Sequence, residues 1–388
     1  MFLLLYECNH NKDEIIMQAK NTSKKLVDPQ TGDVYYEAER LRDKKNGKKI
    51  EWEKHKKRAD KLAEVYEGLS DSQESNYYKK RAMRILECGA VLVYHLYPAT
   101  GEMKLFQVHF CKVRLCPMCS WRRSLKCFGQ MSKVMNYLEE KTDYEYLLLT
   151  LTAKNVTGDM LSGEIDRYLD GFKKMTRRKE YKAISRGHFR SLEITRNWGE
   201  DTYHPHIHAI IAVNKSYFTD SAKYLSQKRW AQLWQDCMGL DYEPRVHVKK
   251  LKPAEEVNPD EPFNIRYAKA VAEVAKYTVK SGDVVFELRK KEREKLVRKY
   301  GREVVEHIER EGERLTPETV MTLDSALRNR RLIAYGGELK CAHKLLSLDD
   351  AVDGDLINTD GEENIRTDLQ AVILEYRWVM GLSDYFQV

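Results

Sequence analysis

The 388-residue sequence lacks any long hydrophobic run, and it contains no internal repeat and no low-complexity tract. Its apolar stretches, such as Met1–Tyr6 and Leu147–Leu151, are far shorter than the roughly 20 residues that a membrane-spanning helix needs. Met1–Tyr6 also lacks a basic segment and a small-residue cleavage site, and Glu7 follows it directly, which argues against a secretory signal peptide. These absences predict a cytoplasmic protein with no membrane partner.

Cysteine is present at eight positions. In the cytoplasm these thiols are reduced, so a cluster of them predicts a metal or catalytic site rather than disulfides. The length allows roughly two to three domains, and 42% hydrophobic residues are enough to build cores for them.

Charge is unevenly distributed, although the formal net charge is only +7. Residues 349–388 carry ten acidic and two basic residues, a net charge of −8, so the rest of the chain carries +15. Residues 103–138 hold seven bases and no acid, and residues 173–190 hold eight bases and one acid. Such dense positive charge favours a polyanion such as a nucleic-acid backbone, and a solvated helix face is the alternative for either segment alone.

The hydrophobic pattern predicts strands separated by helices of unequal length, which indicates an α+β fold. Charged surface helices are expected in residues 12–85. Strands are expected at Ala90–Tyr97, Lys104–Phe110, 145–153, Phe189–Arg196, His204–Val213, Val246–Leu251 and Arg331–Gly337. Helices are expected at about 160–182, 220–238, Asn264–Lys280 and 286–311.

Three histidines alternate in the segment His204-Pro205-His206-Ile207-His208. Because successive side chains of a strand point to opposite faces, the three imidazoles share one face and the apolar residues between and after them face the core. Imidazoles two residues apart can bind one divalent ion. Glu193 on the preceding strand is the expected oxygen ligand, with His204 or His188 as alternatives to it. A polar strand face without a metal is the other interpretation.

The expected helix 264–280 places a carboxylate, a phenol and an ammonium group on one face. Glu273 and Tyr277 are spaced i,i+4, Tyr277 and Lys280 are spaced i,i+3, and Lys276 borders them. Such a group could form a nucleophile with a base and a cation that orients a phosphate. Taken alone, the pattern is also typical of a surface helix with a Glu273–Lys276 ion pair and a half-buried tyrosine.

Four cysteines are spaced like the ligands of a structural zinc site. Cys116 and Cys119 form a Cys-x-x-Cys knuckle, and Cys111 and Cys88 supply two further thiols from an adjacent hairpin. His109 competes with Cys111 for the third place. A redox Cys-x-x-Cys is the alternative, but no thioredoxin-like βαβ pattern surrounds it.

Aromatic and guanidinium side chains follow this knuckle directly. Trp121, Arg122 and Arg123, together with Arg114 before the knuckle, are suited to contact a nucleic-acid backbone. We therefore predict that these four residues bind DNA.

Taken together, these segments resemble the rolling-circle replication initiators of Gram-positive plasmids, members of the HUH (His-hydrophobe-His) endonuclease superfamily. The resemblance covers about residues 85–350. It rests on ordered motifs, namely Phe110–Ser124, Leu149–Thr152, His204–His208, Glu273–Tyr277 and Leu327–Gly337.

The resemblance implies a central antiparallel sheet with flanking helices, with the histidine strand in its middle and the tyrosine helix packed across it. A zinc-stapled N-terminal insert and helical extensions would complete the chain. The implied division is a charged helical region (1–85), a cysteine-rich zinc and DNA-binding module (86–135), a nicking domain (140–348) and an acidic tail (349–388).

The resemblance also implies a chemistry. His206 and His208, together with Glu193, would hold Mg²⁺ or Mn²⁺, and Tyr277 would be the nucleophile of a DNA nickase. Glu273 would activate water for a second, terminating cleavage, and Lys276 or Lys280 would offset phosphate charge. The implied partners are plasmid origin DNA, a host helicase and a DNA polymerase.

Two other classes of protein share part of this pattern. A mobilisation relaxase or a single-strand transposase would use the same metal and tyrosine chemistry, but such proteins usually lack the cysteine knuckle followed by Trp-Arg-Arg. A zinc-dependent DNA-binding repressor would bind DNA without forming any covalent adduct.

Overall fold

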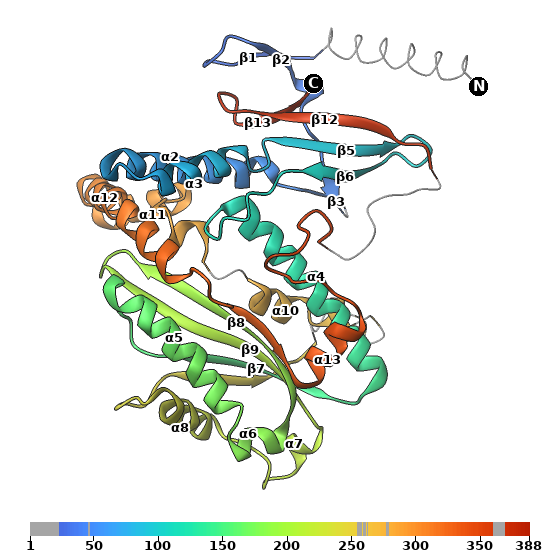
Figure 1. Cartoon of the computed structure of the whole chain (residues 1–388), viewed down its shortest axis with the longest axis vertical. Coiled ribbons are helices and arrows are strands. Elements are labelled where there is room, and N and C mark those ends of the chain that lie inside the picture. Colours follow the sequence, from blue (N-terminus) through green and yellow to red (C-terminus); the bar gives the residue numbers. More distant parts are fainter. Residues whose placement is uncertain are drawn as a thin grey trace.

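The computed structural model describes residues 23–45, 47–253, 258, 261, 263–276, 279–359 and 369–388. Two antiparallel sheets lie at opposite ends of the molecule, and the long helix α4 (Pro117–Lys141) runs from one towards the other (Figure 1). Pro117 occupies the first turn of α4, where its missing N–H costs no intrahelical hydrogen bond. Among the described residues, no helix is long and apolar enough to cross a membrane.

The larger sheet has five strands in the order β10-β7-β9-β8-β11, and every neighbouring pair is antiparallel. The strands are β7 (Glu145–Thr152), β8 (Ser185–Asn197), β9 (Thr202–Val213), β10 (Val246–Lys250) and β11 (Ile333–Gly336). The histidine strand β9 therefore lies in the middle, and the predictions of an α+β fold and of a central antiparallel sheet are confirmed.

Helices cover both faces of this sheet, and β9 contributes alternate residues to two cores. Ile207, Ala209 and Ile211 are fully buried beneath α5 (Gly158–Met175) and α8 (Gln227–Met238). The residues between them, including Ile210, pack on the other face with α4 and α10 (Ala268–Ala275). Each buried isoleucine contributes about 1.5–3 kcal/mol of transfer free energy, so the register of β9 is strongly fixed and with it the face that its histidines occupy.

Gly336 is the last residue of β11 and Gly337 is the first residue of α13, and both allow close packing against β8. A Cβ atom at Gly336 would lie 2.3 Å from Cε1 of His188, and one at Gly337 would lie 2.4 Å from the carbonyl oxygen of Arg186. Gly337 also has a φ of +56°, which favours glycine. Short helices complete this part of the chain: α6 (Lys179–Ile184), α7 (Ser216–Thr219), α9 (Phe263–Arg266), α13 (Gly337–Leu345) and the 3₁₀ turn η2 (Ser281–Asp283).

The smaller sheet combines both ends of the chain in the order β13-β12-β5-β6. Its strands are β5 (Val91–Tyr97), β6 (Glu102–Val108), β12 (Val372–Val379) and β13 (Asp384–Gln387). Helices α2 (Trp52–Gln73) and α3 (Asn76–Glu87) precede it, in agreement with the expected N-terminal helices. Two small hairpins, β1 (Lys25–Val27) with β2 (Val34–Tyr36) and β3 (Lys44–Lys45) with β4 (Lys48–Lys49), flank the 3₁₀ turn η1 (Glu37–Glu39).

The prediction of one continuous helix over residues 286–311 is wrong. The structure has two helices, α11 (Lys290–Tyr300) and α12 (Arg302–Ala326), and Gly301 separates them with a φ of +86°. A left-handed backbone at one glycine is enough to end a helix that charge and periodicity would otherwise continue.

The expected helix 264–280 is also interrupted. It is divided into α9 and α10, and the backbone leaves the helix at Lys276, whose ψ is 134°. Val271, Val274 and Ala275 are buried and form the core-facing side of α10. Lys280 belongs to the following turn and not to the helix, and Tyr277 lies outside the described residues.

Much of the acidic C-terminal region is part of the folded body. Residues 349–359 lie against α4, where Lys126 binds the side chain of Asp349 and the carbonyl oxygen of Asp355. Strand β12 then pairs with β5. This pairing joins the expected acidic tail (349–388) to the expected cysteine-rich module (86–135).

Candidate active site

A carboxylate and two imidazoles converge on the middle of the larger sheet. Glu193 on β8 pairs in register with His206 on β9, and its Oε2 lies 3.3 Å from Nε2 of both His206 and His208. Glu193 and His208 are buried, at 3% and 8% exposure. A set of two imidazole nitrogens and a carboxylate oxygen suits a divalent ion that accepts both nitrogen and oxygen ligands.

The second nitrogen of each imidazole is also engaged, so both rings are held in orientation. Nδ1 of His208 lies 3.2 Å from the hydroxyl of Thr150 on β7, and Nδ1 of His206 lies 3.2 Å from the carbonyl oxygen of His204. Partners of this kind fix the ring and the tautomer of metal-binding histidines. The site is therefore assembled by three adjacent strands.

The two alternative ligands, His204 and His188, have other partners. His204 stacks beside His206 and its Nδ1 lies 2.9 Å from Asn155 Oδ1. His188 lies against Phe172 and Tyr181, with its Nδ1 3.0 Å from the Tyr181 hydroxyl. Burial lowers the pKa of His188 to about 4, so the ring is neutral near pH 7. Neither histidine belongs to the Glu193 group.

A lysine from outside the sheet completes the group. Lys280 Nζ lies 2.5 Å from Glu193 Oε1, the carboxylate oxygen that does not face the imidazoles. Burial alone would raise the pKa of Glu193, but hydrogen bonds from His206, His208 and Lys280 outweigh it and hold the pKa well below its usual range. Glu193 is therefore a carboxylate, as a metal ligand must be.

Helix α10 is fastened to the same face of the sheet. The hydroxyl of Ser191, two residues before Glu193, donates a 2.7 Å hydrogen bond to the carbonyl oxygen of Val274. Glu273 and Lys276 form an ion pair at the end of this helix. The i,i+4 face that was expected to carry Glu273 and Tyr277 does not continue past Ala275, because the helix ends there.

A groove of about 700 Å³ opens beside Lys280 and Lys276. Its other wall consists of α2 and the first turns of α4, including Trp121, whose ring stacks on His55 with centroids 4.4 Å apart. The lining contains both apolar side chains, such as Phe128 and Val279, and charged side chains, such as Arg58. The groove therefore connects the surroundings of the Glu193 group with the cysteine-rich module.

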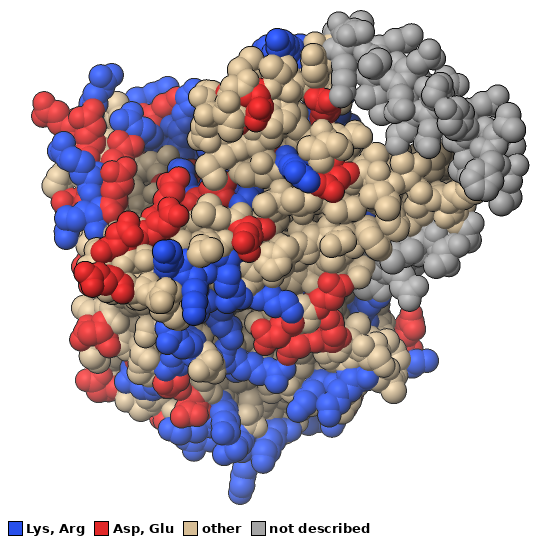
Figure 2. All heavy atoms as spheres, turned by 45° about the horizontal axis from the view of Figure 1, so that its top comes forward, with Lys and Arg blue, Asp and Glu red and all other residues tan. Residues whose placement is uncertain are grey.

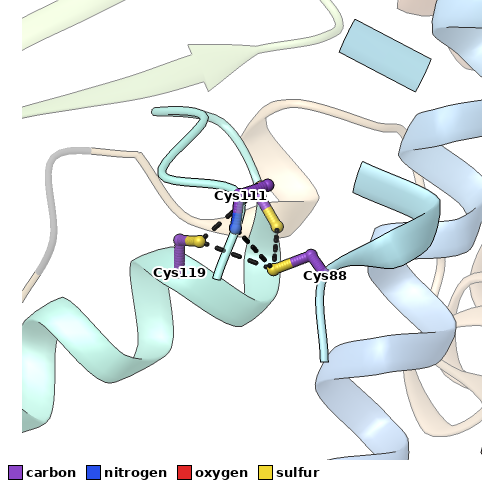
Figure 3. Close-up of side chains that lie close together, drawn as sticks. Cys88, Cys111 and Cys119 are labelled. Carbon is purple, nitrogen blue, oxygen red and sulfur yellow. Dashed lines mark hydrogen bonds between the residues drawn. The ribbon is translucent and has the colours of Figure 1, made fainter. Parts of the chain in front are cut away.

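The four predicted cysteines lie together at the junction of α3, β6 and α4. Three sulfur–sulfur distances are 3.6 Å (Cys88–Cys119), 3.7 Å (Cys111–Cys119) and 3.7 Å (Cys116–Cys88). A tetrahedral site with Zn–S bonds of about 2.3 Å places its sulfurs roughly 3.8 Å apart, whereas a disulfide requires about 2.05 Å. The spacing fits four thiolate ligands of one zinc ion. Figure 3 shows three of the four side chains, Cys88, Cys111 and Cys119, pointing toward one another.

Backbone groups support these sulfurs. The N–H groups of Cys111 and Lys112 donate to the sulfurs of Cys88 and Cys119, at 3.4 and 3.3 Å. Hydrogen bonds from Cys111 and the other two cysteines lower the pKa of Cys119. His109 is exposed and outside the group, so Cys111 takes the place for which the two residues competed.

The C-terminal strands also reach this module. The Tyr385 hydroxyl on β13 donates a 2.6 Å hydrogen bond to the carbonyl oxygen of Gly89, next to Cys88. Gly89 has a φ of +66°, and a Cβ there would lie 2.4 Å from Cε of Met118. The cysteine cluster is thus built from segments of the N-terminal half and braced by the end of the chain.

Two of the predicted DNA-binding residues have other partners. Arg122 donates to the carbonyl oxygens of Leu356 and Ile357, and Arg123 donates to those of Val352 and Lys112. Their exposures are 6% and 1%. The hydrogen bonds of these two guanidinium groups tie α4 to residues 349–359, which leaves them little exposed surface for a DNA backbone. Trp121 and Arg114 are half-buried and remain predicted contacts.

Three residues of the site were missed in the sequence. Thr150 orients His208, Ser191 anchors α10, and Asp283 accepts a 3.0 Å hydrogen bond from the N–H of Arg196 beside Lys280. Thr150 belongs to the motif Leu149–Thr152 and Ser191 alternates with Glu193, so strand alternation could have suggested both. Nothing in the local sequence distinguishes Asp283.

Comparisons with known proteins agree with these observations. A family model described as "Replication protein" matches residues 102–386. A "Protein rep" of Bacillus amyloliquefaciens is 38% identical over 347 residues, which cover 87% of this chain and 94% of that protein. A "Protein rep" of Bacillus sp is 40% identical over 329 residues (83% and 97%), and one of Streptococcus pneumoniae is 31% identical over 322 residues (82% and 87%). No solved structure matches the chain significantly.

Proposed function

Because this chain belongs to the family of replication proteins that its matches define, we propose that it initiates rolling-circle replication of a plasmid. It binds the double-strand origin and nicks one strand through a tyrosine nucleophile, leaving a 3′-OH for a DNA polymerase. We assign the nicking domain to the HUH endonuclease fold, with a host helicase and a polymerase as further partners.

The observation that carries this proposal is the arrangement around Glu193. The Glu193, His206 and His208 side chains meet on the middle strand of the sheet, and Lys280, three residues after Tyr277 in the chain, reaches the same carboxylate. The candidate nucleophile therefore belongs to a segment that is attached to the metal-binding group at one end and to the sheet, through Ser191 and Val274, at the other.

Cleavage of a phosphodiester requires an in-line nucleophile and a stabilised leaving oxygen. His206, His208 and Glu193 would hold Mg²⁺ or Mn²⁺, a Lewis acid that would polarise a non-bridging oxygen of the scissile phosphate. The Tyr277 oxygen attacks phosphorus and the bond to the 3′-oxygen breaks, which gives a 5′-phosphotyrosine and a free 3′-OH. Lys280 and Lys276 place positive charge beside the phosphate.

Termination requires a second cleavage at the regenerated origin. Glu273 acts as a general base for water in that step, so that a single tyrosine suffices. Its carboxylate is partly exposed and paired only with the flexible side chain of Lys276 among the described residues, which leaves it accessible to a water molecule. The Glu273→Ala variant should nick normally but release few single-stranded circles; normal release would contradict the base role.

Zn²⁺ is assigned to the four cysteines on the basis of their sulfur spacing and burial. It would have a structural role, because all of its coordination positions are filled by protein thiolates.

The decisive experiment uses a labelled single-stranded origin oligonucleotide with Mn²⁺, followed by a denaturing gel and mapping of the modified residue. The unmodified chain should form a covalent adduct at Tyr277, and Tyr277→Phe should form none and should leave supercoiled origin plasmid intact. Tyr300→Phe, on the exposed end of α11, is the matched control and should behave like the unmodified chain. A protein-linked nick made by Tyr277→Phe would refute the assignment.

A further inference from the structure

Six cations project from one continuous segment at the end of α5 and on α6. All six are exposed: Lys173, Lys174, Arg177, Arg178, Lys179 and Lys182. None of them forms an ion pair with a described residue. The only acidic residue among them, Glu180, is held 2.6 Å from Arg229. This segment, here called the α5–α6 surface, therefore carries an excess of positive charge.

The other basic segment of the chain is different. In residues 103–138, Arg122, Arg123 and Lys126 are buried and bind backbone or side-chain oxygens of residues 349–359. Lys112 also donates to the carbonyl oxygen of Asp353. Residues 349–359 thus hold four of the seven bases of that segment, whereas no ion pair among the described residues holds the cations of the α5–α6 surface.

The α5–α6 surface is rigidly supported. The residues that alternate with its cations, Phe172, Met175, Tyr181 and Ile184, have exposures of at most 5% and belong to the core beneath the sheet. The positively charged side chains consequently project from a fixed framework, which reduces the entropy lost when they bind. Figure 2 shows mainly Lys and Arg at the lower end of the molecule, where Figure 1 places α6 and α7.

We propose that the α5–α6 surface binds the phosphate backbone of duplex DNA flanking the nick site. Strand β8 leads from this surface to the Glu193 group, and the eight residue-to-residue steps from Ser185 to Glu193 span about 26 Å. At about 3.4 Å per base pair, this distance corresponds to roughly eight base pairs. The cations would hold the duplex while the strand to be cut enters the site on the opposite face of the sheet.

The absence of exposed apolar groups selects the duplex as the partner. Residues 173–186 are all described, and none of their large apolar side chains is exposed. Single-stranded DNA is usually held by aromatic side chains that stack on its bases, and a membrane surface by apolar side chains that insert into it. Cations without such groups match a backbone of regularly spaced phosphates.

This inference rests on the proposed function for its biological setting, but its test does not require cleavage. We would measure the affinity of the full chain for a short duplex of unrelated sequence and for oligo(dT), each over a range of salt concentrations. The triple variant Lys174→Gln, Lys179→Gln and Lys182→Gln is compared with Lys57→Gln, Lys79→Gln and Lys80→Gln, which removes the same charge from exposed positions of α2 and α3.

The α5–α6 variant should lower the slope of log affinity against log salt for the duplex by about 2.7, since each lost phosphate contact contributes about 0.9. Its binding to oligo(dT) and the duplex binding of the control variant should stay unchanged. An unchanged duplex slope, or an equal loss in the control variant, would overturn the proposal. So would loss of binding to phosphatidylglycerol vesicles with duplex binding retained. Failure of the unmodified chain to cleave origin DNA would contradict the proposed function alone.

Discussion

Two groups of candidate metal ligands in this chain differ in how completely they are enclosed. The four cysteines are at most 1% exposed, and their four sulfurs lie within 4.8 Å of one another. Among the described residues, the Glu193 group offers three ligands; it lies next to a groove and has a lysine at the second oxygen of its carboxylate. A closed site has no position for a substrate, whereas a three-ligand site leaves positions open. The difference supports the proposed structural role of the first group and the proposed catalytic role of the second.

The strongest test of this contrast removes one ligand of the Glu193 group. The His208→Ala variant should lose cleavage of the origin oligonucleotide by roughly 10³-fold or more, because a metal ion supplies several kcal/mol of transition-state stabilisation. Its melting temperature should stay close to that of the unmodified chain, since the fold does not depend on this ligand. Retained cleavage in His208→Ala, measured over a range of Mn²⁺ concentrations, would remove the group from the chemistry.

Removing a ligand of the cysteine group should have the opposite outcome. The Cys119→Ser variant should release zinc and lose about 4 kcal/mol or more of unfolding free energy, as expected when a structural metal is lost. Zinc content and denaturant unfolding are the measurements. Cys341→Ser, at an exposed cysteine outside the group, is the control and should change neither. A Cys119→Ser protein with full zinc content and parental stability would contradict the structural role.

A subtler change addresses the orientation of an imidazole. The Thr150→Val variant removes the hydroxyl beside His208 Nδ1, and we expect about a 10–100-fold increase in the Mn²⁺ concentration that gives half-maximal cleavage. Thr152→Val is a matched control on the same strand, because the Thr152 hydroxyl donates to the carbonyl oxygen of Arg245 and not to a histidine. Equal behaviour of the two variants would show that the hydroxyl of Thr150 does not tune the site.

Local patterns in the sequence were sufficient for several parts of the site. The alternation of His206 and His208 fixed their common face, and the adjacent strand placed Glu193 beside them, because both relations follow from strand geometry. The knuckle Cys116–Cys119 was recognisable from spacing alone, and Cys88 and Cys111 lie where a hairpin would bring them.

Other parts depend on contacts between distant segments. Arg122 and Arg123 resemble DNA-binding residues in sequence, but they donate to the carbonyl oxygens of Leu356 and Val352, which lie more than two hundred positions later in the chain. Strand β12 pairs with its neighbour in sequence, β13, on one edge, but on the other edge it pairs with β5, which lies far away in the chain and could not be inferred. Lys280 was expected on one helix face with Glu273 and Tyr277, but it lies at the start of a turn and contacts Glu193.

The pairing of β5 with β12 and β13 has a consequence for synthesis of the protein. The bond from Tyr385 to Gly89 joins positions 296 residues apart, so the sheet beside the cysteine cluster can close only after the ribosome has released nearly the whole chain. Until then β5 has an open edge, which is a site for pairing with other chains. A chain truncated by a late stop codon would keep that open edge permanently, so cells would face an aggregation-prone fragment rather than a shortened protein.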